Sequence, residues 1–144
     1  MNIDIVRLRP DAILPEYQTS GAAGADLHAC IDEPIVLESL DRRVIPTGLA
    51  MAIPEGYEVQ IRARSSMSIK HGITMVNGIG TIDADYRGEV GVLAINLSRE
   101  AFTIEPGMRI AQMVLAKYVT TEWNEVTELD ETIRGTGGYG STGC

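Results

Sequence analysis

The sequence predicts an all-β protein, and three observations lead to that prediction. Helix signals are scarce, apolar residues occur in short runs or alternate with polar ones, and glycines and prolines punctuate the chain about every 8–12 residues. This combination is typical of a sandwich, a jelly roll or a barrel built from short strands. With 144 residues, the chain has the usual length of one domain with its own core.

Five segments carry the strand pattern most clearly. Residues 58–62 alternate strictly between polar and apolar side chains, as a half-buried strand does. Residues 3–8 and 35–37 are shorter apolar runs, whereas residues 90–97 and 110–118 are long and apolar enough for buried strands. We therefore expect strands at these five places, with turns between them.

One short helix is expected as the exception. Ser65 or Ser66 is a candidate N-cap, residues 67–70 have room for about one turn, and Gly72 is a candidate stop. A polar loop between two strands is the alternative, and the local sequence does not decide between the two. A helix that starts here would direct backbone N–H groups toward Arg64 and Ser65, an arrangement that favours anions.

The last quarter of the chain has a different composition. Residues 120–131 contain five carboxylates and the lone Trp123, which predicts a surface linker. Residues 134–144 contain five glycines, so they cannot pack a core and are expected to be mobile when no ligand is bound. We therefore expect one β domain over residues 1–131 and a flexible C-terminal arm over residues 132–144.

The net charge of −8 limits the partners that the protein can have. Nucleic acids and anionic membranes both require basic surface, so neither is expected as a partner. The N-terminus lacks the features of a signal peptide and no apolar run is long enough to span a membrane, which predicts a soluble cytoplasmic protein. A nucleotide substrate would need local arginines and a divalent cation.

Three segments carry residues suited to chemistry. Arginines and hydroxyl groups concentrate at residues 62–70, and the glycine-rich arm also suits phosphate oxygens, although no lysine completes a Walker A motif. Residues 77–89 begin with an Asn-Gly turn signal and contain Asp83 and Asp85, which would share one face of a strand. One of these acids could be a general base. The residues alone favour the alternative, which is a plain turn with a local Asp–Arg pair.

In their order and spacing, five segments resemble the five motifs of the trimeric dUTPase family. They are residues 23–27 (AGADL), 64–67 (RSSM), 80–89 (GTIDADYRGE), 106–112 (PGMRIAQ) and 134–143 (RGTGGYGSTG). The resemblance implies a jelly-roll or distorted β-barrel subunit and a homotrimer whose three active sites are each built from all three chains. It also implies hydrolysis of dUTP to dUMP and pyrophosphate with Mg²⁺, which keeps uracil out of DNA and supplies dUMP for thymidylate synthesis.

The resemblance further implies roles for single residues. Asp83 matches the general base that activates a water for in-line attack on the α-phosphorus, and Asp26 matches an acid that holds magnesium through water. Tyr86 matches the ring under the deoxyribose, where it leaves no room for a 2′-hydroxyl. Asn77 matches the amide that reads uracil, within a hairpin that excludes larger bases. The other implied substrate-binding residues are Arg64, Ser65, Ser66, Ile82, Gln112, Arg134 (a clamp on the γ-phosphate), Gly138, Tyr139 (closing over uracil), Gly140 and Ser141.

The sequence departs from the family pattern at a few positions. Ser66 and Met67 replace the usual Gly-Leu of the second motif, and Tyr139 stands where phenylalanine is commoner. The related dCTP deaminases carry Arg-Ser-Ser at the second motif, but their nearby arginine and catalytic glutamate match Ile69 and Leu93, which cannot activate water. The resemblance therefore favours a dUTPase over a deaminase or a non-catalytic nucleotide sensor. A regulatory protein partner in addition to catalysis stays open.

Overall fold

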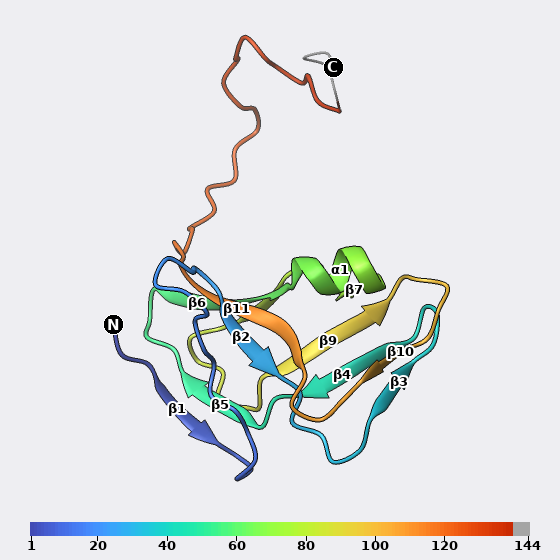
Figure 1. The fold of residues 1–144 in the computed structure, drawn as a ribbon. Coiled ribbons are helices and arrows are strands. Elements are labelled where there is room, and N and C mark those ends of the chain that lie inside the picture. The colour runs from blue at the N-terminus through green and yellow to red at the C-terminus, as the bar shows by residue number, and fades with distance from the viewer. Residues whose placement is uncertain (140–144) are drawn as a thin grey trace.

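The all-β prediction with one short helix is confirmed in the computed structural model, which describes residues 1–139 (Figure 1). The elements, in chain order, are β1 (Asp4–Arg7), β2 (Ala25–His28), β3 (Ile35–Leu37), β4 (Arg42–Pro46), β5 (Leu49–Ala52), β6 (Tyr57–Ala63), α1 (Ser65–His71), β7 (Ile73–Met75), β8 (Gly80–Ile82), β9 (Gly91–Asn96), β10 (Phe102–Ile104) and β11 (Arg109–Lys117). Each of the five strands expected from the sequence is present. Within the described residues, no helix is long and apolar enough to cross a membrane.

The strands form four antiparallel groups. The largest sheet has the order β2-β11-β6-β8, a second has the order β4-β9-β7, and β1-β5 and β3-β10 form two-stranded pairs. Neighbours in these sheets are distant in sequence, as in a jelly roll, and the sheets described for residues 1–139 do not close into a complete barrel. The large sheet matters most for function, because it places the second and fourth motifs beside the first.

The core lies between these sheets and follows the period of two along each strand. In β6, Val59 and Ile61 are buried, whereas Arg62 points to the opposite face of the strand and is exposed. In β9, Val92 and Ala94 are buried in the same way. The buried amide of Asn96 is satisfied, because its Nδ2 donates to the carbonyl oxygens of Leu37 and Glu100, each at 2.8 Å.

The helix is present, but its start differs from the expectation. Arg64, not Ser65 or Ser66, is the N-cap residue, with φ −84° and ψ 133°, and no side chain caps the helix. Ser65 is already helical, so its hydroxyl cannot take the capping position, and the side chain of Arg64 is engaged elsewhere. Gly72 ends the helix as predicted, at φ 67°, where its N–H bonds to the carbonyl oxygens of Met67 and Ser68.

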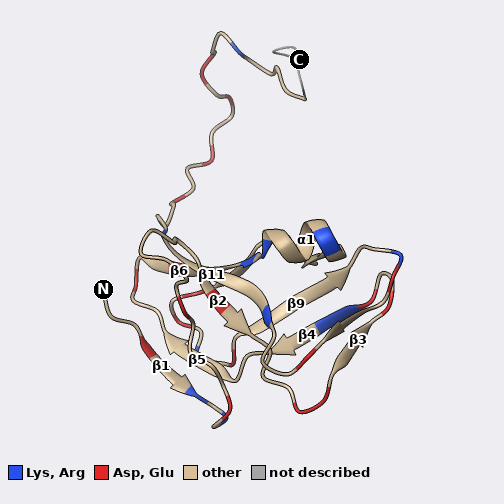
Figure 2. Ribbon diagram, in the orientation of Figure 1, with Lys and Arg blue, Asp and Glu red and all other residues tan. Residues whose placement is uncertain are grey.

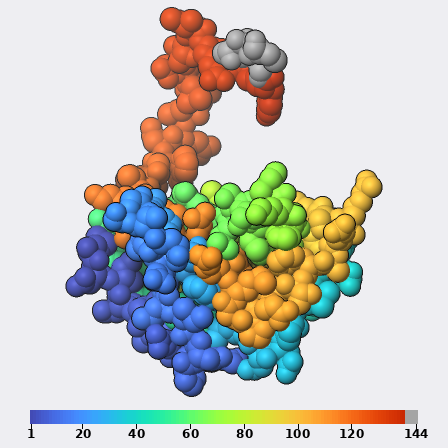
Figure 3. All heavy atoms as spheres, viewed as in Figure 1, coloured from blue at the N-terminus to red at the C-terminus, as the bar shows by residue number. Residues whose placement is uncertain are grey.

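Beyond β11 the chain leaves the body. Residues 118–139 project as an extended, almost entirely exposed segment (Figures 1 and 3). Figure 2 shows acidic residues spaced along it, in accordance with the predicted linker. Regular structure in the described residues ends at Lys117, and the boundary between residues 131 and 132 stays a prediction.

Candidate functional site

A buried aspartate connects three segments of the large sheet. Asp26 in β2 is 8% exposed. Its Oδ1 lies 3.3 Å from Nε of Arg64, and its Oδ2 accepts a hydrogen bond from Nη1 of Arg109 at 3.1 Å. Nη1 of Arg64 also donates to the carbonyl oxygen of Arg109 at 3.0 Å. The carboxylate therefore fixes both guanidinium groups where β2, β11 and the start of α1 meet.

The register of β2 and β11 explains this arrangement. Gln112 is the Cα partner of Asp26 and Arg109 is the partner of His28, with an irregularity between Arg109 and Ala111. The Gln112 amide donates to the carbonyl oxygen of Ala63 on the other side of β11, at 3.1 Å. Gly24 leaves space for this side chain, because a Cβ there would lie 3.2 Å from Cδ of Gln112. The structure thus brings together three predicted positions, Asp26, Arg64 and Gln112.

Arg109 is a member of this group that the sequence did not single out. It lies in the fourth motif, where only Gln112 was given a role. Its importance comes from its ion pair with Asp26, 83 residues away in sequence. The sequence feature that could have indicated Arg109 is a basic residue at the start of an apolar strand in an otherwise acidic chain.

A basic cavity of about 430 Å³ opens next to this group. Its lining consists of Arg64, Ser66, Met67, Lys70, His71, Phe102, Met108 and Arg109, and it includes no carboxylate. Figure 2 shows basic residues at both ends of α1. A cavity with this charge in a chain of net charge −8 is suited to phosphate groups. Ser65, the first residue of α1, is exposed beside it.

His28 lies behind the same group in a partly buried position. Burial lowers its pKa, and the positive charges of Arg109 and Arg64 lower it further, against the opposing effect of Asp26 and Glu16. Its Nδ1 is buried and has no hydrogen-bond partner within residues 1–139. The imidazole is therefore held in its neutral form close to two arginines.

The second group of predicted residues follows β8. The strand ends at Ile82, and the N–H of Tyr86 bonds to the carbonyl oxygen of Asp83 at 3.2 Å, which closes a turn. Asp83 and Asp85 therefore lie in a turn, which is the interpretation that the residues alone favoured, and not on one face of a strand. The local Asp–Arg pair is absent from the described residues, because Nη1 of Arg87 donates to the carbonyl oxygens of Ala84 and Tyr86.

Asp83 stands at the edge of a pocket of about 270 Å³. The lining residues are Val44, Thr81, Ile82, Asp83, Tyr86, Glu89, Gly91 and Leu93. The Asp83 carboxylate is exposed and has no hydrogen-bond or ion-pair partner among residues 1–139. A free carboxylate beside an aromatic ring and apolar side chains can accept a proton from a bound water. Leu93, which lines the same pocket, has an apolar side chain that cannot accept a proton.

Asn77 lies in the turn that precedes β8. Its Nδ2 is close to Gly80 at the start of that strand, because a Cβ on Gly80 would lie 3.5 Å away from it. The two strands that flank this turn do not pair with each other, so the expected hairpin is absent among the described residues. The turn joins β7 to β8, but β7 pairs with β9 and β8 pairs with β6, because the chain crosses here from one sheet to the other.

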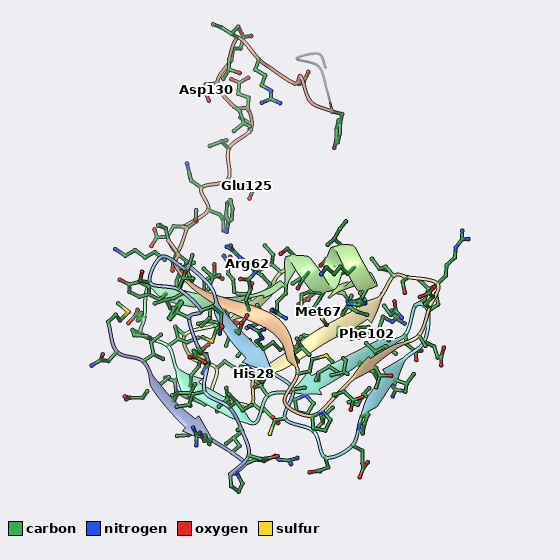
Figure 4. All side chains as sticks on the ribbon, in the orientation of Figure 1. His28, Arg62, Met67, Phe102, Glu125 and Asp130 are labelled. Atoms are coloured by element: carbon green, nitrogen blue, oxygen red, sulfur yellow. The ribbon has the colours of Figure 1, made fainter. Side chains whose placement is uncertain are left out.

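The chain does not bring all predicted residues together. Two groups result: the Asp26 group, which consists of Asp26, Arg64, Arg109 and Gln112, and the Asp83 group, which consists of Asp83 and Tyr86. No hydrogen bond or ion pair within the described residues joins the Asp26 group to the Asp83 group. The arm is also separate: Nε of Arg134 donates to the carbonyl oxygen of Gly137 at 2.9 Å, and Tyr139 is fully exposed. Figure 4 shows Glu125 and Asp130 on the projecting segment, well away from Met67 and His28 in the body. Gly138 is half-exposed in this arm, whereas Gly140 and Ser141 lie outside the described residues.

Comparison with known proteins finds a matching family model, similar sequences and similar solved structures. The family model described as dUTPase matches residues 10–143. The deoxyuridine 5′-triphosphate nucleotidohydrolase of Fusobacterium nucleatum subsp. nucleatum is 58% identical over 130 residues, which cover 90% of this chain and 89% of that protein. A variant of the Staphylococcus bacteriophage 80alpha dUTPase, solved with dUpNHpp, superposes with a TM-score of 0.89 at 29% identity and covers 99% of both chains.

A second solved structure concerns a metal. It is a variant of the dUTPase from phage phi11 of S. aureus, which reveals the coordination of a structural Mg(II) ion. Its TM-score is 0.82 at 26% identity, and the match covers 91% of this chain and all of that one.

Proposed function

We propose a reaction from one premise: this chain belongs to the dUTPase family. It is a hydrolase of the deoxyuridine 5′-triphosphate nucleotidohydrolase class. The reaction we propose is attack of water on the α-phosphorus of dUTP, which releases dUMP and pyrophosphate. The observation that carries the proposal is the Asp83 carboxylate, which has no hydrogen-bond or ion-pair partner among residues 1–139 and lines a pocket together with Tyr86.

Asp83 is the general base of the proposed mechanism. Its carboxylate accepts a proton from the attacking water while the water oxygen bonds to the α-phosphorus. The bond from the α-phosphorus to the bridging oxygen breaks, and pyrophosphate leaves with the electron pair. No covalent intermediate is needed, so the protein contributes positioning and charge stabilisation.

Tyr86, Ile82 and Asn77 select the nucleotide in this proposal. The Tyr86 ring lies under the deoxyribose and excludes a 2′-hydroxyl, and Ile82 adds apolar contact in the same pocket. Asn77 pairs with the edge of uracil. Hydrogen-bonded selection of this kind discriminates strongly, because a wrong base leaves buried polar groups without partners.

The triphosphate is assigned to the basic cavity. The proposed ligands are Arg64 and Ser66, which line the cavity, together with Ser65 and Gln112 next to it. Asp26 keeps the guanidinium groups of Arg64 and Arg109 in place. The arm adds Arg134, Gly138, Tyr139, Gly140 and Ser141 when it closes over the nucleotide. Tyr139 provides an aromatic face for stacking on uracil.

Magnesium is part of the proposal, and the donor set limits how it binds. Among residues 1–139, no group of three or more His, Cys, Asp or Glu side chains could hold a metal ion. Both oxygens of Asp26 are engaged by arginines, so Asp26 fits a contact through water and not direct coordination. The triphosphate and water would supply the ligands, and the bound cation would neutralise charge on the phosphate oxygens.

A homotrimer with shared sites is the assembly we propose. The pocket that contains Asp83 and the cavity that contains Arg64 share no lining residue, which supports a site built from the residues of several chains. The projecting segment also exposes large apolar side chains, since Trp123 is 91% and Leu129 is 84% exposed. A sedimentation mass of three chains is the expected result. A cytoplasmic location belongs to the same proposal.

The deciding experiment measures pyrophosphate release from dUTP, dCTP, dTTP and UTP with magnesium. We expect release from dUTP to be far faster than from the other three nucleotides, with dUMP as the second product. An absence of release from dUTP would refute the proposal, and ammonia release from dCTP would assign the chain to the deaminases instead.

A further inference from the structure

We propose that Gly88 and Glu89 are positioning residues that hold the Tyr86 ring and thereby set the preference for 2′-deoxyribose over ribose. The inference rests on the proposed dUTP hydrolysis and assigns part of its specificity to two residues that act through the Tyr86 ring. Three sets of contacts support it.

The first contact is steric. A Cβ added to Gly88 would lie 2.6 Å from Cζ and 3.0 Å from Cε2 of the Tyr86 ring. Side chains do not approach this closely, so any residue larger than glycine must displace the ring. The requirement is one of space and not of backbone conformation, because Gly88 does not have a positive φ.

The second contact holds the same, hydroxyl-bearing end of the ring. The hydroxyl of Tyr86 donates a hydrogen bond to the carbonyl oxygen of Glu89 at 3.0 Å. The carboxylate of Glu89 in turn accepts from the backbone N–H of Gly48 at 2.7 Å. The ring is therefore connected, through Glu89, to the turn between β4 and β5.

The third set of contacts makes that turn a rigid support. The hydroxyl of Thr47 donates to the carbonyl oxygen of Val90 at 2.6 Å, and the N–H of Val90 bonds to the carbonyl oxygen of Leu49 at 2.8 Å. Gly48 itself is enclosed, because a Cβ there would lie 2.7 Å from Sγ of the buried Cys30. The loop that carries Tyr86 is thus fastened to the core at consecutive residues.

A ring held in this way excludes a larger sugar better than a ring that can move aside. Rejection of a hydroxyl by contact depends on a wall that does not yield by even a few tenths of an ångström. Loosening the support should therefore help UTP relative to dUTP, in addition to any general loss of activity. This change in the ratio separates a positioning role from a purely structural one.

The principal test is Gly88→Ala in the full-length protein. We expect the ratio of kcat/KM for dUTP to kcat/KM for UTP to fall about tenfold or more. Gly21→Ala is the matched control, because a Cβ at Gly21 meets nothing within 4 Å and should leave the ratio unchanged. Circular dichroism and sedimentation mass establish that each variant keeps the fold and assembly of the wild type.

A pair of substitutions at Glu89 tests the hydrogen-bonded part without steric strain. Glu89→Ala removes the acceptor for the Gly48 N–H and should lower the ratio several-fold, about the effect of one hydrogen bond. Glu89→Gln retains an oxygen that can accept the same bond, so it should stay close to wild type. If Gly88→Ala does not fold, this pair decides the question alone.

A double substitution shows whether the effect passes through the ring. In a Tyr86→Ala background, where the ratio is already reduced, adding Gly88→Ala should change the ratio no further. A folded Gly88→Ala variant with the wild-type ratio would overturn the inference, as would equal ratios for Glu89→Ala and Glu89→Gln. Both results leave the proposed function intact, which fails only if the wild type releases no pyrophosphate from dUTP.

Discussion

The two acidic residues of the candidate site, Asp26 and Asp83, are held in opposite ways. Asp26 is buried and neutralised by two arginines that come from β11 and from the start of α1. Asp83 is exposed at the end of β8 and has no partner in residues 1–139. A paired carboxylate organises its surroundings, whereas an unpaired one is free to exchange a proton. The position of each acid in the fold thus assigns the first to positioning and the second to chemistry.

The strongest way to test this contrast is Asp83→Asn. The amide cannot accept the proton of the attacking water, so kcat should fall about 10²–10⁴-fold while dUTP still binds. The free energy of unfolding should not change, because no contact of Asp83 is lost. Turnover and equilibrium binding of dUTP check this outcome, with Asp85→Asn as the comparison. Wild-type kcat in Asp83→Asn would move the role of base to Asp85.

Removing the arm should have the next largest effect. A chain that ends before Arg134 loses the proposed γ-phosphate clamp and the ring of Tyr139, so turnover should fall about 10²-fold. The fold should survive, because the one hydrogen bond of the Arg134 side chain within residues 1–139 goes to Gly137 of the arm. Steady-state kinetics and thermal unfolding of the truncated protein check both parts. A truncation that unfolds the protein would contradict the separation of arm and body.

Asp26→Asn should show the reverse pattern to Asp83→Asn. It leaves the guanidinium groups of Arg64 and Arg109 without their counter-charge, which should lower the free energy of unfolding by about 2 kcal/mol. The estimate is moderate because both arginines are partly exposed. KM for dUTP should rise as the phosphate-binding groups lose their fixed positions. Urea unfolding provides the measurement, and an unchanged midpoint would contradict the positioning role.

The smallest expected effect concerns pH and His28. Its pKa is lowered in the folded protein from an ordinary value of 6.5, first by burial and then by Arg109 and Arg64. As the pH falls below about 6.5, the unfolded chain binds a proton that the folded protein does not, so stability decreases. The His28→Gln substitution removes this difference in proton binding, so the Tm of the variant should depend less on pH between about 7 and 5 than the Tm of the wild type. The same dependence of Tm on pH in the wild type and in His28→Gln would contradict a role of His28 in the loss of stability at low pH.

The sequence predicted those parts of the fold that depend on local pattern. Residues 58–62 alternate because β6 has one buried face, and the actual strand, Tyr57–Ala63, extends the expected range by one residue at each end. Strand β2 was missed, because its Ala-Asp-Leu-His sequence places a buried acid where an apolar residue would signal a strand. Strand β5, Leu-Ala-Met-Ala, was missed because it lacks β-branched residues.

The candidate site was predictable residue by residue but not as an arrangement. Arg64, Gln112 and Asp26 come together through the pairing of β2, β11 and β6, and a single sequence does not specify which strands pair. The ion pair of Arg109 depends on the same pairing. The residues favoured a turn at Asp83, and the hydrogen bond from the Tyr86 N–H to the Asp83 carbonyl oxygen closes that turn.

The projecting segment has a consequence for assemblies that contain two kinds of chain. If the arm of one chain completes the site of another, as proposed, the arm and the Asp83 of any one site belong to different chains. Two inactive chains, one of each kind, should then restore activity when they assemble together, because some sites combine an intact arm with an intact base. A single inactive chain would conversely impair its normal companions. The activity of mixed assemblies would therefore depend on which part of each chain carries the defect.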